Sequence, residues 1–523
     1  MLETQTMKTA PALPGLRYYL PPVTAPDAEP TRADVVVYGA TSGGVTTAVR
    51  AAQEGMSVLL LAFDDHVGGM SAAGLGTTDV GRPETVGGMA RHFYAQVAAA
   101  YHAPDPHWGV EAHVAEEIFT RWLSDAGVRV RHRQHLTGVT MTDGRITELR
   151  TDDGNRYRAT VYVDASYEGD LMAAAGVTYT VGRESRDSYG EPLAGVQYSD
   201  NHQFTLDVDP WRESGRPESG LLPGISADPY EAIGTGDHRV QAYNFRLHVT
   251  TSARRLPFPE PEGYDPDRYE LLRRYVEAGG YELFGRTTEV RPGVFDMNNH
   301  GAVSSDHIGA NYDWPEADYA RREEIFQDHV RYQAGLLHFM ATDARLPAAV
   351  REDTRRYGLA PAEFTGTAHW PHQLYVREAR RMVSSYVITQ HDAAGRIAAA
   401  DPVALASYVM DSHNTKRVLV DGRPRNEGNV QHPVTVPFGV PYLSIVPGPG
   451  ECANLLVTWA LSASHVAFSS ARMEPVFMMI GEAAGCAAAQ AIESRVSIPE
   501  VDYETLRKAL LRGGSLLTWP PSA

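Results

Sequence analysis

The sequence predicts an α/β fold whose parallel sheet is assembled from both ends of the chain, with an α+β domain inserted between them. Three observations predict it. Near the N-terminus a β-branched strand, a glycine turn, an apolar-faced helix and a second buried strand follow one another. A later strand ends in a small-residue turn, and a long helix of small residues lies near the C-terminus. The strand, turn, helix and strand order is that of a Rossmann-like unit.

The first unit carries the glycines of a nucleotide-binding turn. The run Asp34–Val37 predicts a short buried strand, and Gly39, Gly43 and Gly44 follow it directly. The next residues repeat apolar side chains at helical spacing, and Ser57–Phe63 predicts the second strand. A helix that opens on such a turn directs unpaired N–H groups at a pyrophosphate. The segment therefore predicts a dinucleotide site, and with it an oxidoreductase.

The residues after the second strand decide between the dinucleotides. Thr41 stands at the usual second glycine, and the position of the ribose-binding acid falls on Ala62. A second glycine pair, Gly68-Gly69, is typical of flavin sites, where the chain passes close to the ADP and ribityl parts of FAD. The range Leu59–Met70 holds no Arg or Lys for a 2′-phosphate. We therefore rank FAD above NAD, and NAD above NADP.

The composition excludes several classes of protein. The chain has 523 residues and a formal net charge of −18, which argues against nucleic acid and anionic membranes as partners. Its two cysteines, Cys452 and Cys486, are too few for a disulfide framework. No apolar run predicts a membrane span, and residues 1–32 lack the apolar core of a secretory signal. We expect a cytoplasmic protein whose residues 1–32 form an extended arm.

The rest of the chain divides into three predicted parts. We expect the arm at 1–32, a Rossmann-like FAD-binding domain at 33–182 and 440–523, and a substrate domain at 183–439. Strands are expected within Arg129–Ala165, with hairpin turns at Asp143-Gly144 and Asp153-Gly154, and again at Asn454–Val457. Periodicity is poor in Ser185–Pro292. Helices are expected at Gly87–Tyr101, Glu111–Ala126, Asp318–Thr342 and Pro371–His391.

The last predicted helix starts at Glu474-Pro475, because proline is tolerated at the first helical position. Its small residues, such as Gly481 and Gly485, permit close packing and are compatible with an ordinary core helix. In a chain with an N-terminal dinucleotide fold, the positive end of this helix can instead face the flavin pyrimidine. There it would stabilise the negative charge that develops as the flavin is reduced.

Further motifs lie along the whole chain: YGATSGG, DHVGGM, GGMARHFY, VDASYEGDLMAAAGV, NNHGAVSSDHIGANYDWPEADYA, AHWPHQLYVREARRM, MDSHN and LSASHVAFSSARMEPVFMMIGEAAG. With these motifs the chain resembles a bacterial family of FAD-dependent oxidoreductases in the two-domain flavoprotein class with a glutathione-reductase-like FAD fold. The resemblance runs from Asp34 to the last helix and specifies no substrate. The family usually has an acid where Ala62 stands, so Asp64, a water or backbone groups would replace it.

The resemblance implies a set of FAD contacts. The pyrophosphate is expected at the glycine turn, the adenosine at the end of the second strand and beside Leu136, the ribityl chain at the second glycine pair, and the isoalloxazine at the last helix. The residues are Gly39, Thr41, Ser42, Gly43, Gly44, Phe63, Asp64, Gly68, Gly69, Met70, Leu136, Ala165, Ser166, Met473, Pro475 and Val476.

A histidine is the natural base for hydride transfer to a flavin, because its pKa lies near neutral pH. We rank His372 and His465 first and His413 next, and we expect Arg377 to hold a substrate carboxylate or oxyanion. A fourth histidine, His369, shares the HWPH segment with His372. Proline between that pair breaks the helix which a metal site would need, so no metal is expected.

The predicted function is FAD-dependent oxidation of a small organic molecule, with sugars and ring compounds as candidates, by hydride transfer to flavin N5. Oxygen or an external acceptor would reoxidise the flavin. Two alternatives stay open. One is a flavin monooxygenase or halogenase-like enzyme, which would need NAD(P)H or a reductase. The other is a non-redox lyase or isomerase that keeps FAD structurally. The oligomeric state, a homodimer included, also stays open.

Overall fold

A five-stranded parallel sheet forms the centre of the nucleotide-binding half. The computed structural model describes residues 9–23, 26–285 and 287–520. In order across the sheet the strands are β21 (Leu455–Val457), β8 (Val161–Asp164), β2 (Val35–Tyr38), β3 (Val58–Leu61) and β4 (Arg129–Arg131). Every neighbouring pair is parallel. Because β21 comes from the C-terminal end of the chain, both ends build one sheet, and the predicted fold class is confirmed.

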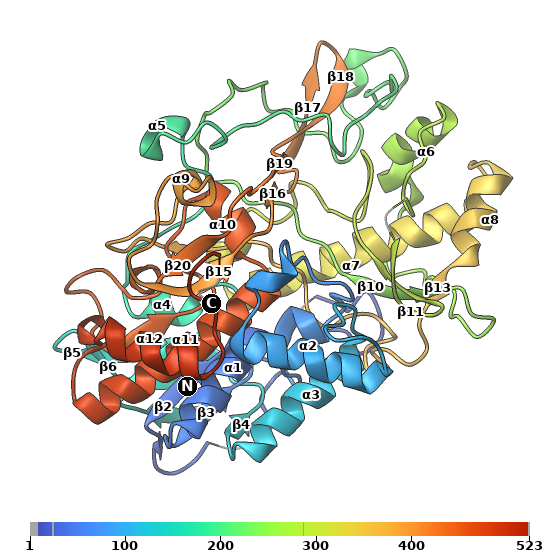
Figure 1. The fold of residues 1–523 in the computed structure, drawn as a ribbon. Helices are drawn as coiled ribbons and strands as arrows, with labels where there is room; N and C mark the ends of the chain where they lie inside the picture. Colours follow the sequence, from blue (N-terminus) through green and yellow to red (C-terminus); the bar gives the residue numbers. More distant parts are fainter. Residues whose placement is uncertain (1–8, 24–25, 286, 521–523) are drawn as a thin grey trace.

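The helix that follows the glycine turn packs against the late helix. The first, α1 (Ser42–Gln53), joins β2 to β3, and the late helix is α11 (Glu474–Ser494). A Cβ on Gly481 would lie 2.2 Å from the carbonyl oxygen of Gly43, so only glycine permits this approach. Figure 1 shows both helices in the same lower region as β2 and β3. The small residues of α11 thus serve close helix packing, as the sequence predicts.

The predicted hairpins form a second, smaller sheet. Its strands are β1 (Thr31–Arg32), β7 (Arg156–Arg158), β6 (Arg145–Thr151) and β5 (Leu136–Thr142), in that order. Asp143 and Gly144, which join β5 to β6, both have positive φ, at 48° and 70°. This is the backbone of a type I′ turn, whose twist matches that of the flanking strands.

The middle of the chain holds a third sheet and several strand pairs. The sheet has the order β11 (Thr287–Arg291), β12 (Val294–Met297), β10 (Leu247–Thr250), β13 (Gly358–Leu359). The pairs are β14 (Arg381–Met382) with β9 (Tyr179–Thr180), β15 (Pro402–Ala406) with β20 (Phe438–Pro441), β16 (Met410–Ser412) with β19 (Val430–His432), and β17 (Lys416–Val420) with β18 (Arg423–Glu427).

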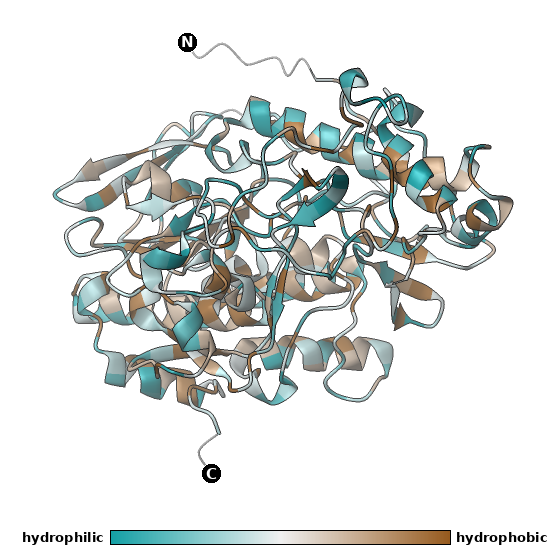
Figure 2. Cartoon of the chain, turned by 90° about the horizontal axis from the view of Figure 1, so that it is seen from above, coloured by the Kyte–Doolittle hydropathy of each residue, from teal (hydrophilic) through white to brown (hydrophobic). Residues whose placement is uncertain are grey.

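The remaining α-helices lie around these sheets. They are α2 (Gly88–Tyr101), α3 (Ala112–Asp125), α4 (Asp170–Ala174), α5 (Arg186–Tyr189), α6 (Glu270–Glu277), α7 (Tyr319–Thr342), α8 (Ala348–Arg356), α9 (Gln390–Ala393), α10 (His465–Ala471) and α12 (Tyr503–Arg512). Figure 2 shows teal and brown residues side by side on the peripheral helices, as amphipathic helices require. The helices predicted at Gly87–Tyr101, Glu111–Ala126 and Asp318–Thr342 form nearly as expected.

The helix predicted at Pro371–His391 does not form. The segment is irregular and extended as far as the short strand β14, and only α9 begins near its end. Arg377, Glu378 and Arg381 are buried instead of forming a solvated face. Glu378 accepts from the backbone N–H of Gln241 at 3.0 Å, and Arg381 forms an ion pair with Glu184 at 2.6 Å. These distant partners fix an extended backbone and override the helical pattern.

The N-terminal arm packs into the fold over the part that the structure describes. Leu13, Leu16 and Tyr18 are buried, and the backbone N–H of Tyr18 donates to Glu323 on α7 at 3.0 Å. The ring of Tyr18 lies 4.7 Å from that of Phe63, at the end of β3. Residues 1–8 and 24–25 of the predicted arm lie outside the described residues. The arm thus covers one end of the nucleotide-binding sheet.

By length and composition α11 could cross a membrane, which the sequence analysis did not anticipate. It has 21 residues, and 89% of its most apolar window is buried inside the protein. Its neighbours are α1, α2 and α12. Burial on this scale makes α11 a core helix of this fold.

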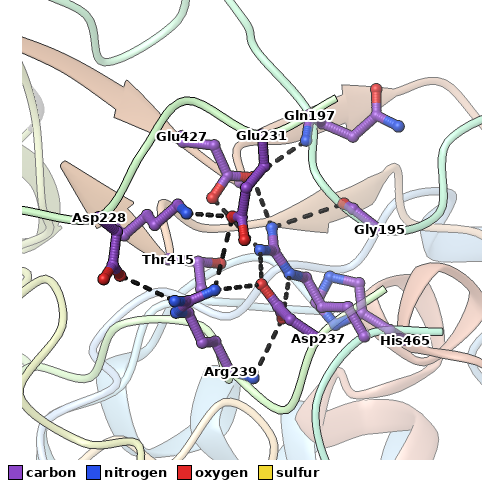
Figure 3. A network of polar contacts seen from close by, with 12 residues as sticks. Gly195, Gln197, Asp228, Glu231, Asp237, Arg239, Thr415, Glu427 and His465 are labelled. Carbon is purple, nitrogen blue, oxygen red and sulfur yellow. Dashed lines mark hydrogen bonds and ion pairs between the residues drawn. The ribbon is translucent and has the colours of Figure 1, made fainter. Parts of the chain in front are cut away.

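A buried ion network ties an irregular segment to the hairpin β17–β18, which projects at the top of Figure 1. Arg183 has no exposed side-chain surface and lies 2.6 Å from Glu427 on β18. Its Nε donates to Asp237 at 3.0 Å, and Arg239 also donates to Asp237 at 3.0 Å. Figure 3 shows Asp237, Arg239 and Glu427 converging on this network. The network fixes residues 183–240, whose sequence has little periodicity of its own.

We expect Asp237→Asn to weaken the fold at neutral pH and to flatten its acid dependence. Burial opposes ionisation, but hydrogen bonds and charge from Arg183 lower the pKa of Asp237 to about 2. The unfolded pKa is about 3.9. Asp237 therefore contributes stability above about pH 4, which is lost as the pH falls toward about 2. The variant should lose up to about 3 kcal/mol in urea denaturation at pH 7.

The control is Asp228→Asn, because Asp228 is a half-exposed partner of Arg239 and should contribute little. Urea denaturation of both variants and the parent at several pH values from 7 to about 2 measures the effect. If the free energy of unfolding of Asp237→Asn depends on pH as steeply as that of the parent, the role given to this carboxylate is contradicted.

Candidate active site

The glycine turn between β2 and α1 accepts no side chains at its tightest points. Gly39 has φ 103°, and a Cβ there would lie 2.6 Å from the carbonyl carbon of Ala165. A Cβ on Gly44 would lie 1.9 Å from the carbonyl oxygen of Gly39. Thr41, at the usual second glycine, is the N-cap of α1, where its Oγ1 accepts from the Gly44 N–H at 3.1 Å. Thr41 therefore stabilises the start of α1.

A cavity of about 580 Å³, partly open to solvent, lies in front of this turn. Six residues predicted to contact FAD line it: Gly39, Thr41, Phe63, Asp64, Gly69 and Ser166. A Cβ on Gly69 would lie 2.3 Å from the hydroxyl of Tyr167, so the chain here also requires glycine. The glycine cradle and the start of α1 fit the pyrophosphate and ribityl parts of FAD.

Other residues predicted to contact FAD lie in three segments that meet near this cavity. Glu474, in the first turn of α11, accepts from Ser71 at 3.1 Å and from Tyr167 at 3.0 Å, and Ser42 also donates to it. Burial raises the pKa of Glu474. The glycine turn, the second glycine segment and α11 therefore meet at one carboxyl group. The predicted residues in or beside these segments are Ser42, Gly43, Gly44, Gly68, Met70, Ala165, Met473, Pro475 and Val476.

Leu136 lies outside the residues that line the cavity. Its backbone N–H donates to the hydroxyl of Tyr38 at 3.3 Å, and its carbonyl accepts from the hydroxyl of Tyr319 at 2.9 Å. Two tyrosine hydroxyls thus hold the backbone groups that were expected beside the adenine. Nearby, Ala62 offers no polar side chain, whereas Asp64 lines the cavity, and burial raises the pKa of Asp64.

His372 lies on the side of the cavity expected for the adenosine. Its ring stacks on that of His66 at 3.8 Å, and both residues line the cavity together with Asp64. Burial, followed by the nearby charge of His66, lowers the pKa of His372 to about 3. The imidazole is therefore neutral, and it lies apart from the start of α11.

His465 is buried, and both of its ring nitrogens have partners inside the protein. Its Nδ1 donates to Glu378 at 2.8 Å, and its Nε2 lies 3.1 Å from the hydroxyl of Ser412. The residue is 1% exposed, so both ring nitrogens are engaged inside the protein. Through Ser412 it supports the segment that carries His413.

A second, polar cavity lies next to the start of α11. It has a volume of about 320 Å³, partly open to solvent, and Arg472, directly before the N-cap Met473, is on its wall. Asp79, a few residues after the short 3-10 helix Gly69–Ala72, is on another wall. The full lining is Asp79, His202, Arg246, Asn298, Asn299, Tyr375, Tyr408, Asp411, His413, Gln431 and Arg472. The lining of this cavity therefore contains both hydrogen-bond donors and hydrogen-bond acceptors.

Of the three predicted histidines, His413 is the one that lines this cavity. Its Nδ1 donates a hydrogen bond to Asp306 at 2.8 Å. Asp411 lies 3.5 Å from Nε2. Arg377 lies 3.0 Å from Asp306 and has no exposed surface, so it acts on His413 through that carboxylate. Despite burial, the charges of Arg377 and His413 hold the pKa of Asp306 below its usual value.

Apart from His413, the residues that line this cavity were not among the predicted site residues, and His202 and Tyr375 illustrate why. His202 lies in a stretch without periodicity, and no local pattern distinguishes it. Burial, with the charge of His413, lowers the pKa of His202 to about 4, so its ring is neutral. Tyr375 has Arg377, Arg246 and Arg472 around its ring, with guanidinium carbons 4.8, 5.9 and 5.9 Å from its centroid. Only the tertiary fold brings these residues together.

A family model described as FAD dependent oxidoreductase matches residues 34–510. A search of curated proteins finds no match. Among solved structures, the chain is similar to the anhydrotetracycline hydroxylase OxyS from Streptomyces rimosus, at 15% identity and TM-score 0.24 over 33% of this chain and 41% of that one. It is also similar to L-amino acid deaminase from Proteus vulgaris, at 17% identity and TM-score 0.23 over 31% of this chain and 54% of that one. The chain thus covers under two thirds of either structure.

Proposed function

The chain belongs to this family of FAD-dependent oxidoreductases, and on that premise we propose that it oxidises a small polyhydroxylated molecule bound in the polar cavity, with His413 as the base. FAD is its cofactor, and the protein is an enzyme. The observation that carries the proposal is the polar cavity itself, which borders the start of α11 and contains His413.

The residues of the glycine turn would hold the cofactor at its pyrophosphate. Gly39 and Gly44 leave room for backbone approach, and α1 directs its N-terminal amides at the phosphates. The start of α11 would lie at the flavin, where its positive end favours an electron-rich ring. Bound FAD would supply a hydride acceptor, which amino-acid side chains cannot provide.

The lining of the cavity supports a polyol or sugar as substrate. A hydroxyl group both donates and accepts hydrogen bonds. Asp79 and Asp411 can accept from hydroxyls, while Arg246 and Arg472 can donate to them. Tyr375 and Tyr408 add aromatic surface for the carbon skeleton. A purely anionic substrate is a poorer fit, because Asp296 and Asp411 already pair with Arg246 and Arg472.

His413 would take the hydroxyl proton as the carbon is oxidised. In this role the neutral ring would donate from Nδ1 to Asp306 and take the proton at Nε2, and Asp306 and Asp411 would both stabilise the imidazolium that forms. Arg377 is then a positioning residue, since it contacts Asp306 and the backbone of Ala242. His202 is neutral and lines the same cavity, so it is the second candidate for this role.

We further propose that oxygen or an external acceptor reoxidises the flavin and that the enzyme is cytoplasmic. The assignment of 33–182 and 440–523 to cofactor binding, and of 183–439 to substrate binding, is part of the same proposal. The polar cavity supports it, because Asp79 and Arg472 come from the first group and Tyr375 and His413 from the second.

We expect anaerobic addition of a sugar, sugar alcohol or related polyol to bleach the yellow absorbance of the purified holoenzyme. A panel should contain polyols, their deoxy analogues and carboxylic acids without hydroxyls. The deoxy analogues are the matched control, because each lacks one partner for the cavity. A missing hydroxyl that leaves a buried polar group unpaired should slow bleaching by about 10-fold or more.

Other outcomes would overturn the proposal in distinct ways. Bleaching by NAD(P)H with no response to any polyol would indicate a monooxygenase-like reaction. Turnover of a compound without any bleaching would indicate a non-redox reaction. Bleaching by hydroxyl-free acids alone would retain the oxidase chemistry and reject the substrate class.

A further inference from the structure

We propose that Glu111, His113, His248 and Glu363 bind one divalent transition metal ion of the zinc class. Glu111 is the N-cap of α3 and His113 lies in its first turn. His248 is on β10. Glu363 lies in the loop after β13, a strand of the same sheet as β10. The ligand atoms of Glu111, His113 and Glu363 all lie within 4.8 Å of one another, and His248, outside that group, approaches it through Glu363. Two imidazoles and two carboxylates are ligands that zinc accepts.

Unpartnered buried atoms point to a ligand at this cluster. Within the described residues, both ring nitrogens of His248 and Oε1 of Glu111 are buried without a hydrogen-bond partner. The side chain of His248 has no exposed surface, and its Nδ1 lies 3.6 Å from Oε2 of Glu363, which is too long for a hydrogen bond. A buried imidazole with neither nitrogen satisfied is costly. A metal ion between Nδ1 and the carboxylate would satisfy it.

The surroundings of the cluster are those of a metal site. Oε2 of Glu111 accepts from Arg291 at 2.6 Å, which orients the carboxylate and leaves Oε1 free. Nδ1 of His113 lies 2.5 Å from Oε1 of Glu363, so these two ligands are already adjacent. The side chain of His113 is 43% exposed and leaves an entry path from solvent. The arrangement has a buried floor and one open side.

The site would hold the cofactor-binding and middle parts of the chain together. Two ligands come from the start of α3, which follows the glycine segments, one comes from β10, and one comes from the loop after β13. His248 also lies against the backbone at Gly76, where a Cβ would be 2.6 Å from its Nε2. The role we assign is therefore structural. The sequence analysis, which considered only His369 and His372, expected no metal.

The test is zinc binding to the FAD-loaded protein after treatment with a chelator. Competition with a chromophoric chelator should give one zinc per chain, and the ion should raise Tm by a few degrees. His248→Gln and Glu363→Gln should each weaken binding by about 100-fold or more. His113→Ala, at a half-exposed position that the fold tolerates, should weaken binding at least about 10-fold without lowering the Tm of the metal-free protein.

The matched control is His338→Gln, because His338 also lies near a carboxylate, Glu260, at 3.4 Å, but belongs to no group of three ligands among the described residues. This variant should bind zinc like the parent. The proposal fails if the parent binds no stoichiometric zinc, or if the His113 and His248 variants bind it as tightly as the parent does. All readouts are independent of substrate turnover.

Discussion

Replacing His413 with alanine is expected to slow anaerobic flavin reduction by about 10²–10⁴-fold while FAD content stays at the parental level. The physical reason is the loss of the acceptor nitrogen that Asp306 orients toward the polar cavity. Single-turnover reduction with a polyol that bleaches the parent measures the effect. A true base should also change the pH profile of the reduction rate, which the loss of a merely structural histidine would not do.

Two further variants make this result specific. His432→Ala removes an exposed histidine on β19, and its flavin should be reduced at the parental rate. His202→Ala removes the neutral histidine of the same cavity and should have the smaller effect of the two cavity variants. If His202→Ala has the larger effect, the proton goes to His202 and the role of His413 is electrostatic. If the flavin is reduced at the parental rate in both variants, the base does not lie in this cavity.

We expect Gly44→Val to abolish FAD retention. An added Cβ would lie 1.9 Å from the carbonyl oxygen of Gly39, so β2 and α1 would have to separate where the pyrophosphate is expected. Gly43→Val is the milder companion, since its Cβ would meet the carbonyl oxygen of Phe477 at 3.0 Å. It should also release FAD, because a branched side chain blocks backbone approach. Chromatography of the flavin released by heat measures occupancy.

The control is Gly366→Val, because no described residue other than its chain neighbours lies within 4 Å of a Cβ there and the residue has no left-handed φ. It should keep full FAD occupancy. Thr41→Gly should lose the cap of α1 and the hydrogen bond that Oγ1 donates to the carbonyl of Ala165 at 2.8 Å, together about 1–2 kcal/mol, and should retain most of the flavin. A folded Gly43→Val variant with parental occupancy would contradict the placement of the pyrophosphate.

The sequence predicted the nucleotide-binding half well because its signals are local. The glycine turn, the βαβ order, the hairpin turn at Asp143-Gly144 and the start of α11 each depend on a few neighbouring residues. Backbone conformation and helix capping act over the same short range. The family motifs along the chain led to the FAD assignment, which the family match confirms.

The helix expected at Pro371–His391 was wrong for the opposite reason. Its charged residues have helical spacing, but their partners, among them Asp306, Glu184 and His465, are far away in the sequence. A buried arginine or glutamate takes whatever backbone conformation satisfies its charge, since an unpaired buried charge costs several kcal/mol. No local pattern announces which charges will be buried.

The sequence by itself therefore determined the fold class, the cofactor and the position of the glycine cradle. Tertiary structure alone decided which histidine lies beside the start of α11, since His413, Asp306, Asp411 and Arg472 come together only in the folded chain. It also assembled the cluster of Glu111, His113, His248 and Glu363 from three segments that are distant in the sequence. The reason is that a site depends on contacts between residues that are far apart in the sequence. Turns, caps and strand order are instead set by residues that are near neighbours in the sequence.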